Sequence, residues 1–298
     1  MKKKHRQAFS LIEISVVIVV IGILIAGISS GIELYDDYKL KVAQNITKNS
    51  RVNRIPDLEM WLETTAENSL AMGTTSFTDK PNPADQDRIG RWNDINPNII
   101  APAKNNATQA ISTDNQPKYI RNGMNGLPTL LFDGADDYFS YNGDFLVGAD
   151  YTIFVVEARN SSNNVNYFLA GISQLKNNET LHLGYRMDNI ITQAHYGNDL
   201  DKSISNFKST ISRIHSFVFS KSNGKSIYTD GGVKTNNVTQ KSPLTSYPGA
   251  TIGYFENAAS YYYKGSIAEI IFYTRALTNK ERQEVELYLS KKWSIKLG

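Results

Sequence analysis

The sequence contains no cysteine, and its N-terminal region has little that would interrupt a helix. Without cysteine the chain has no disulfide bond, iron–sulfur cluster, thiolate zinc site or thiol nucleophile. Proline is absent between Phe9 and Ile55, so no residue there lacks the backbone N–H that a helix needs. From Phe9 to Ile28, Glu13 is the single charged side chain. The segment is therefore expected to form one long, apolar helix.

The apolar segment is long enough to cross a membrane. At about 1.5 Å per residue, the stretch from Phe9 to Ile28 forms a helix of about 30 Å, which matches the hydrocarbon thickness of a bilayer. Basic residues precede it and acidic residues follow it: Lys2, Lys3, Lys4 and Arg6, then Glu33, Asp36 and Asp37. This bias predicts a cytoplasmic N-terminus, with the rest of the chain on the other side.

Glu13 is costly inside such a helix. An ionised side chain there costs about 2.5–3.5 kcal/mol, which makes Glu13 a candidate functional residue. One alternative is a secretory signal cleaved near Ala26, but signals have an apolar core of about 7–15 residues and this run is longer. Helix-compatible spacing also continues to Ile46. A second alternative, a plain membrane anchor, explains the length but not the acid.

The residues Gln7-Ala8-Phe9-Ser10-Leu11-Ile12-Glu13 and the apolar run after them resemble the N-terminus of type IV pilins and type II secretion pseudopilins. The resemblance implies that a prepilin peptidase cuts between Ala8 and Phe9 and methylates the new amine of Phe9. It also implies that Glu13 aids assembly by pairing with the terminal amine of a neighbouring pilin or pseudopilin subunit. The implied location is the bacterial inner membrane and then a periplasmic or cell-surface filament. The family usually has glycine before the cut, where this chain has Ala8.

The net charge changes once the leader is considered separately. The whole chain has 32 basic and 29 acidic residues. Four of the basic residues lie in residues 1–8, so 28 remain against 29 acidic ones after cleavage. Nucleic-acid binding needs a concentrated basic patch, and we expect no nucleic-acid partner. The pair Lys291-Lys292 is too short for such a patch and is expected to lie on a solvated helix face.

After Pro56 the pattern becomes that of β-strands. Strand patterns occupy 151–159, 180–187, 212–220, 250–254, 261–264 and 266–273. Asn223-Gly224 between two of these runs predicts a hairpin. Thr278 and Glu281 have capping-box spacing before a helix that runs to Trp293. The fold class is therefore mainly β, an antiparallel sandwich between a long N-terminal helix and a C-terminal helix.

The expected domains are a leader over 1–8, a pilin-like helix over 9–54 with its membrane span at about 9–28, and a β domain over 55–298. The β domain resembles the laminin-G-like members of the concanavalin A-like lectin superfamily, which implies a jelly-roll sandwich. The resemblance is carried by residues 58–62, 90–94, 116–119, 125–138 and 265–278, with Glu281 and Arg282. Residues 73–117 read as a long loop, of which Trp92 predicts that part is packed.

The strand patterns give no sign of glycosidic hydrolysis. Retaining glycosidases need two carboxyl groups about 5–5.5 Å apart. Glu157 and Glu269 each stand alone in their strands, and Asp136 and Asp137 are adjacent, so in an extended chain they point to opposite faces. The chain is therefore predicted not to be an enzyme, although the fold alone leaves activity open.

Asp133, Asp136 and Asp137 form a dense acidic cluster and are the candidate calcium ligands. Members of the superfamily often bind calcium through such oxygen ligands. The alternative is a turn in which aspartate bonds its own backbone. Metal-binding relatives commonly have an aspartate where this chain has Ala268, and we assign no cofactor.

Tyr261, Tyr262 and Tyr263 must send at least one ring to solvent if they form a strand, and exposed tyrosine suits contact with a sugar or a protein. The alternative is a packing position. His182, His195 and His215 lack metal-ligand spacing and are expected to be structural. Two functions follow: a filament subunit whose lectin-like head binds a glycan or surface protein, or a purely structural subunit of a pilus or secretion pseudopilus.

Overall fold

The computed structural model describes residues 11–161, 165–171, 176–204, 210–256 and 260–298. The chain divides into two compact units between Val42 and Ala43. The first unit is helical, and the second, which we call the head, is mainly β.

The N-terminal helix α1 runs from Leu11 to Lys48 and has 38 residues. Its apolar side chains are exposed, with Leu11 85%, Ile18 64% and Ile25 59% accessible. Among the described residues, it is the one helix that is long and apolar enough to cross a membrane. The expected long helix is confirmed.

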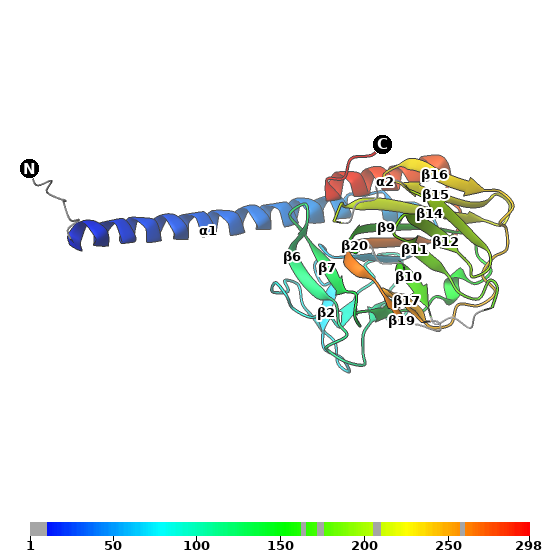
Figure 1. Cartoon of the computed structure of the whole chain (residues 1–298), viewed down its shortest axis with the longest axis horizontal. Coiled ribbons are helices and arrows are strands. Elements are labelled where there is room, and N and C mark those ends of the chain that lie inside the picture. Colours follow the sequence, from blue (N-terminus) through cyan, green and yellow to red (C-terminus); the bar gives the residue numbers. More distant parts are fainter. Residues whose placement is uncertain (1–10, 162–164, 172–175, 205–209, 257–259) are drawn as a thin grey trace, which may run out of the picture. The chain divides into compact units, whose positions relative to one another are not determined.

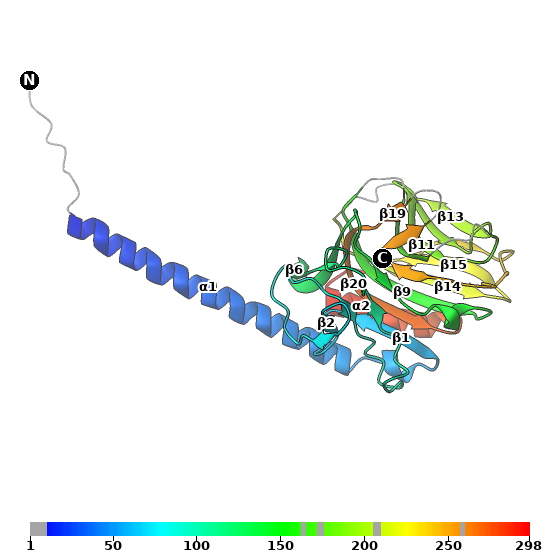
Figure 2. The ribbon, with the colours of Figure 1, turned by 90° about the horizontal axis from the view of Figure 1, so that it is seen from below.

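The head contains two large antiparallel sheets (Figures 1 and 2). In the described residues the first sheet has eight strands in the order β16-β15-β14-β9-β20-β7-β6, and β1 also pairs with β20. Its strands are β1 Leu58–Glu63, β6 Lys118–Met124, β7 Leu127–Asp133, β9 Tyr151–Arg159, β14 Arg213–Ser220, β15 Gly224–Thr229, β16 Gly232–Asn237 and β20 Lys264–Tyr273. The predicted hairpin at Asn223-Gly224 joins β14 to β15, with Ser220 opposite Gly224.

The second sheet has ten strands among the described residues, in the order β13-β12-β11-β10-β17-β8-β5-β4-β2-β3. They are β2 Leu70–Met72, β3 Thr78–Asp79, β4 Arg91–Trp92, β5 Ala107–Thr108, β8 Phe139–Ser140, β10 Asn166–Gly171, β11 His182–Met187, β12 Ile190–Ala194, β13 Asp199–Ser203 and β17 Ala250–Ile252. A separate hairpin pairs β18 Tyr254–Glu256 with β19 Ser260–Tyr262. Short 3-10 helices occupy Val52–Arg54 and Asp144–Leu146.

The main core contains buried side chains from both sheets, among them Phe168, Phe217 and Leu183. Trp92 also belongs to this core, which confirms that part of 73–117 is packed. Alternate residues of a strand point to opposite faces, so residues such as Phe154 and Ile271 of the first sheet belong to a different cluster.

The C-terminal helix α2, Asn279–Trp293, shares that second cluster. Figure 1 shows it, in red, beside the sheet that contains β14, β15 and β16. The predicted capping box is present: Thr278 Oγ1 accepts from Glu281 N, and Glu281 Oε2 accepts from Thr278 N at 2.9 Å. Leu289 and Trp293 are fully buried against the sheet, and a buried side chain of this size contributes about 1.5–3 kcal/mol. The expected sandwich with a C-terminal helix is confirmed.

Candidate ligand-binding site

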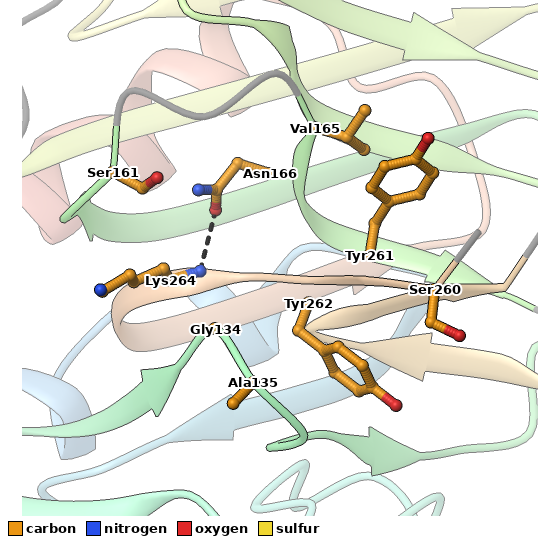
Figure 3. A pocket seen from close by; sticks show the side chains of 9 residues that line it. All are labelled: Gly134, Ala135, Ser161, Val165, Asn166, Ser260, Tyr261, Tyr262 and Lys264. Carbon is orange, nitrogen blue, oxygen red and sulfur yellow. Dashed lines mark hydrogen bonds between the residues drawn. The ribbon is translucent and has the colours of Figure 1, made fainter.

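A pocket of about 420 Å³ lies between the β18–β19 hairpin, the start of β20 and the turn after β7. Figure 3 shows its lining side chains, which come from segments distant in sequence. They are Gly134, Ala135, Ser161, Val165, Asn166, Ser260, Tyr261, Tyr262 and Lys264. The pocket thus combines aromatic rings, a cation, an amide and hydroxyl groups.

The hairpin sends its tyrosines in different directions because neighbouring residues of a strand alternate in side-chain direction. Tyr261 is opposite Phe255 in the register, and the two rings are nearly parallel at 6.3 Å between centroids. Tyr262 is opposite Tyr254 instead. Tyr261 and Tyr262 are half-exposed and Tyr263 is fully buried. The expectation that at least one of the three rings reaches solvent is confirmed.

Tyr262 is the end of a row of three rings. Its ring stacks on Tyr254 with centroids 4.6 Å apart and planes 19° apart. Tyr254 in turn contacts Tyr138 at 5.2 Å. Burial, followed by the effect of Tyr254, raises the pKa of Tyr262 to about 12.

Lys264 and Asn166 form the polar side of the pocket. The backbone N of Lys264 donates to Asn166 Oδ1 at 3.0 Å (Figure 3). The Lys264 side chain passes over Gly134, which has φ +81°, and a Cβ at Gly134 would lie 2.7 Å from Lys264 Cβ. Glycine is therefore required there by conformation and by space.

The acidic cluster begins at the last residue of β7, next to the pocket. Oxygens of Asp133, Asp136 and Asp137 lie within 4.8 Å of one another and are the described carboxylates that could hold a metal ion. Asp133 Oδ1 accepts from Ala135 N at 2.7 Å, and Asp137 Oδ2 accepts from Asp133 N at 2.9 Å. The side chains therefore bond the backbone of their own turn, as the turn interpretation expects.

Asp137 is the buried member of the cluster. Burial raises the pKa of Asp137 to about 7, the carboxylates of Asp133 and Asp136 act in the same direction, and Arg88 opposes them. Arg88 Nη1 lies 3.5 Å from Asp137 Oδ1. Both oxygens of Asp137 thus have protein partners.

Of the predicted processing and assembly residues, Ala8 and Phe9 lie outside the described residues. Glu13 lies in the first turn of α1. These three residues remain proposals.

One prediction about the head was wrong: Lys292 is buried, although the neighbouring Lys291 is exposed as expected. Lys292 Nζ donates to Glu63 Oε2 at 2.7 Å and to Glu269 Oε2 at 3.0 Å. Trp61 Nε1, Trp293 Nε1 and Tyr288 OH also donate to Glu269, at 2.7, 2.8 and 2.8 Å. The helical pattern did show Lys292 beside Trp293, but its partners lie on distant strands.

Glu157 is the other buried strand glutamate. His215 Nε2 lies 3.0 Å from its Oε1, and Tyr185 OH donates to the same atom at 2.7 Å. Tyr263 OH donates to its other oxygen at 2.5 Å. His195 is also buried, with Nε2 2.9 Å from Tyr151 OH. Both histidines have the structural, hydrogen-bonded role that was expected.

A family model described as the prokaryotic N-terminal methylation motif matches residues 3–29. The matched segment contains Ala8, Phe9 and Glu13. No curated protein matches the chain. The chain therefore has a prepilin-type motif at its N-terminus, and this motif supports a pilin-like or pseudopilin-like subunit.

The fold of this chain resembles that of several solved structures. Trypanosoma rangeli sialidase in complex with sialic acid matches with a TM-score of 0.51 and 16% identity, over 80% of this chain and 33% of the sialidase chain. The same sialidase in complex with 2,3-difluoro-KDN gives a TM-score of 0.53 and 14% identity, over 86% of this chain and 39% of the sialidase chain. Domain 4 of AbnA, a GH43 extracellular arabinanase from Geobacillus stearothermophilus in complex with arabinotriose, has a TM-score of 0.46 and 13% identity. The match covers 58% of this chain and 81% of the AbnA domain.

The chain spans about a third of the length of the sialidase chains that it matches. At these identities the likeness concerns the fold alone. The head is thus a β-sandwich of a kind that also occurs in sialidases.

Proposed function

We propose that this chain is a minor pilin or pseudopilin-like filament subunit that displays a lectin-like head for binding a surface ligand. A prepilin peptidase would cut between Ala8 and Phe9 and methylate Phe9. Glu13 would then pair with the terminal amine of a neighbouring subunit. The subunit would lie in the bacterial inner membrane, with a cytoplasmic N-terminus, before it enters a periplasmic or cell-surface filament.

The observation that carries the proposal is the methylation motif over residues 3–29, running into a helix whose apolar surface is exposed. None of the 18-residue apolar window of α1 is buried within the structure. An exposed apolar surface of this extent needs a membrane or other subunits to cover it. Insertion into a membrane would bury this surface in lipid, and later assembly would bury it against the corresponding helices of other subunits.

Pairing also gives Glu13 a physical role. A carboxylate in an apolar environment is tolerable when it is paired with a cation. Cleavage before Phe9 would create an ammonium group about one helical turn away. Pairing between subunits that are displaced along the filament axis would therefore satisfy both charges in the filament and specify the register of the helices.

The head is proposed to be laminin-G-like, within the concanavalin A-like superfamily, and to bind without hydrolysis. Glu157 and Glu269 are fully buried and accept hydrogen bonds from core side chains. Asp137, whose raised pKa would suit an acid catalyst, has both oxygens engaged by Asp133 N and Arg88. These arrangements support a structural role for the three carboxyl groups.

Processing is tested by the intact mass of the protein extracted from membranes of its host. The mature chain is expected to begin at Phe9 with a methylated amine. A chain that begins at Met1, or after Ala26, would contradict the pilin interpretation.

Assembly is tested with Glu13→Gln, and Glu33→Gln is the matched control on the same helix. Glu13→Gln should be inserted and cleaved normally but be depleted from sheared filaments, because the ammonium of its neighbour loses its partner. Glu33→Gln should assemble like wild type, because Glu33 is exposed beyond the apolar run. Equal recovery of both variants would show that Glu13 has another role.

The purified protein should release no reducing sugar from polysaccharides. Release that persists after repurification and is lost in Asp137→Asn would make the head an enzyme. The alternative function is a purely structural head. It predicts that filaments form normally and that the head binds no glycan or surface protein.

A further inference from the structure

The row of three tyrosines ends at the pocket. Tyr254 contacts both other rings, Tyr262 at 4.6 Å and Tyr138 at 5.2 Å between centroids. One face of the Tyr262 ring is therefore covered by Tyr254. Tyr262 is half-exposed and lines the pocket, so part of its ring is accessible to a ligand. A ligand ring with an apolar face, such as the C–H face of a pyranose, would pack on Tyr262 and continue the stack.

The lining of the pocket includes both hydrogen-bond donors and acceptors. Lys264 and Asn166 line the pocket and offer an ammonium and an amide, and Ser260 offers a hydroxyl. Asp133, the exposed carboxylate of the acidic turn, pairs with Lys264 in the register between β7 and β20. Sugar hydroxyl groups donate and accept, so they match a mixed set better than an apolar or purely anionic ligand does.

The charges near the pocket indicate a neutral ligand. Lys264 is the cation among the lining residues. Asp133 and Asp136 lie close by, and the Asp136 carboxylate is near enough to contribute to raising the pKa of Tyr262. A ligand carboxylate would gain from Lys264 but would be repelled by these two aspartates. A neutral sugar ring avoids that repulsion and keeps the hydrogen bonds.

Hydrogen bonds to the main chain link the segments that line the pocket. Gly253 N, just before the hairpin, donates to Phe168 O at 3.1 Å, and Tyr263 N, just after it, donates to Gly253 O at 2.8 Å. On the other wall, Asn166 Oδ1 fixes the backbone of Lys264. Segments that are already hydrogen-bonded lose less entropy when they bind a ligand, which favours binding of a small, rigid ring.

We propose that this pocket binds the ring of a neutral sugar, with the ring stacked on Tyr262 and its hydroxyl groups bonded by Lys264, Asn166 and Asp133. The inference rests on the proposed ligand-binding role of the head and names the class of ligand.

The test uses the full-length protein in a zwitterionic detergent that has no sugar headgroup. The probes are one carrier protein conjugated with many copies of glucose, galactose or mannose, and the same carrier conjugated with glucuronate or sialic acid. Multivalent probes are used because single sugar contacts are weak. Wild type should bind at least one neutral conjugate in preference to both acidic ones.

Tyr262→Ala should weaken that binding by about tenfold or more, because it removes the stacking surface. Tyr262→Phe keeps the ring and should retain most of the binding. The matched control is Tyr196→Ala, another half-exposed tyrosine of the head, away from the pocket lining. Its binding should equal that of wild type. Circular dichroism and the melting temperature of each variant separate lost binding from lost folding.

Two kinds of result would overturn the sugar proposal. The first is preference for an acidic conjugate that disappears in Lys264→Met, which would show that the cation dominates recognition. The second is equal binding by wild type and Tyr262→Ala, or binding to none of the conjugates. Either result leaves the filament proposal standing if Phe9 processing and Glu13-dependent assembly are observed, so the two failures can be told apart.

Discussion

Replacing Lys292 with methionine should destabilise the head strongly, because two buried carboxylates share this one ammonium. Lys292 Nζ lies 2.7 Å from Glu63 Oε2 and 3.0 Å from Glu269 Oε2, and all three side chains are fully buried. Methionine keeps much of the packing volume but removes the charge. Breaking a buried ion pair by removing one partner costs about 3–5 kcal/mol, because the remaining charge is left uncompensated.

The assay is urea unfolding of a head fragment that begins at Ala43, where the compact unit begins. Lys291→Met is the matched control, because Lys291 is the preceding residue of α2 and is exposed. Its free energy of unfolding should change by no more than about 0.5 kcal/mol. Lys292→Met should lose about 3–5 kcal/mol on the same scale.

The dependence on pH provides a second measurement. Burial raises the pKa of Glu269, Lys292 opposes that rise, and Glu63 adds to it. A raised folded-state pKa means that the folded state holds the proton more tightly, so this group favours folding at low pH and disfavours it as the pH rises. Without Lys292, the pKa of Glu269 should be raised further. The stability deficit of Lys292→Met should therefore shrink as the pH falls from 7 toward 5.

Equal unfolding midpoints for Lys292→Met and Lys291→Met would refute this reasoning. A deficit that is the same at pH 5 and pH 7 would refute the electrostatic part and leave only lost packing.

Two further predictions concern the head. A fragment that begins at Ala43 should be more stable than one that begins at Ile55 by about 1.5–3 kcal/mol in urea unfolding, because Val52 is buried in the core under α2; equal midpoints would contradict this. Glu157→Gln should destabilise the head at neutral pH. Burial raises the pKa of Glu157, but hydrogen bonding with His215 outweighs burial and holds this pKa below its ordinary value of 4.5. The stabilisation of the head by ionised Glu157 is complete above the ordinary pKa and is lost as the pH falls through the lower folded-state pKa. The acid unfolding curves of Glu157→Gln and wild type should therefore converge at low pH.

Much of the fold was predictable because the determining signals are local. The absence of proline, an apolar run with Glu13 as its single charge and helix-compatible spacing up to Ile46 predicted the helix that the structure places from Leu11 to Lys48. Strand patterns, the Asn223-Gly224 turn and the Thr278 capping box each depend on residues a few positions apart, and each was confirmed. The methylation motif is also local, and the family match over residues 3–29 needs no tertiary structure.

The buried ionic contacts were not predictable, because their partners are far apart in sequence. The helical spacing places Lys292, unlike Lys291, on the buried face of α2 with Tyr288 and Leu289. Only the pairing of β1 with β20 brings Glu63 and Glu269 to it. Glu157 and His215 meet for the same reason, through the pairing of β9 with β14.

The candidate pocket shows the division most clearly. The sequence alone determined that a tyrosine of 261–263 would reach solvent, since side chains alternate along a strand. Which tyrosine lines a pocket, and beside which polar groups, was decided by tertiary structure. Tyr138 joins Tyr254 and Tyr262, and Asn166 fixes Lys264, only after segments from three parts of the chain pack together. Burial and register act across the whole chain, so short-range patterns cannot specify these contacts.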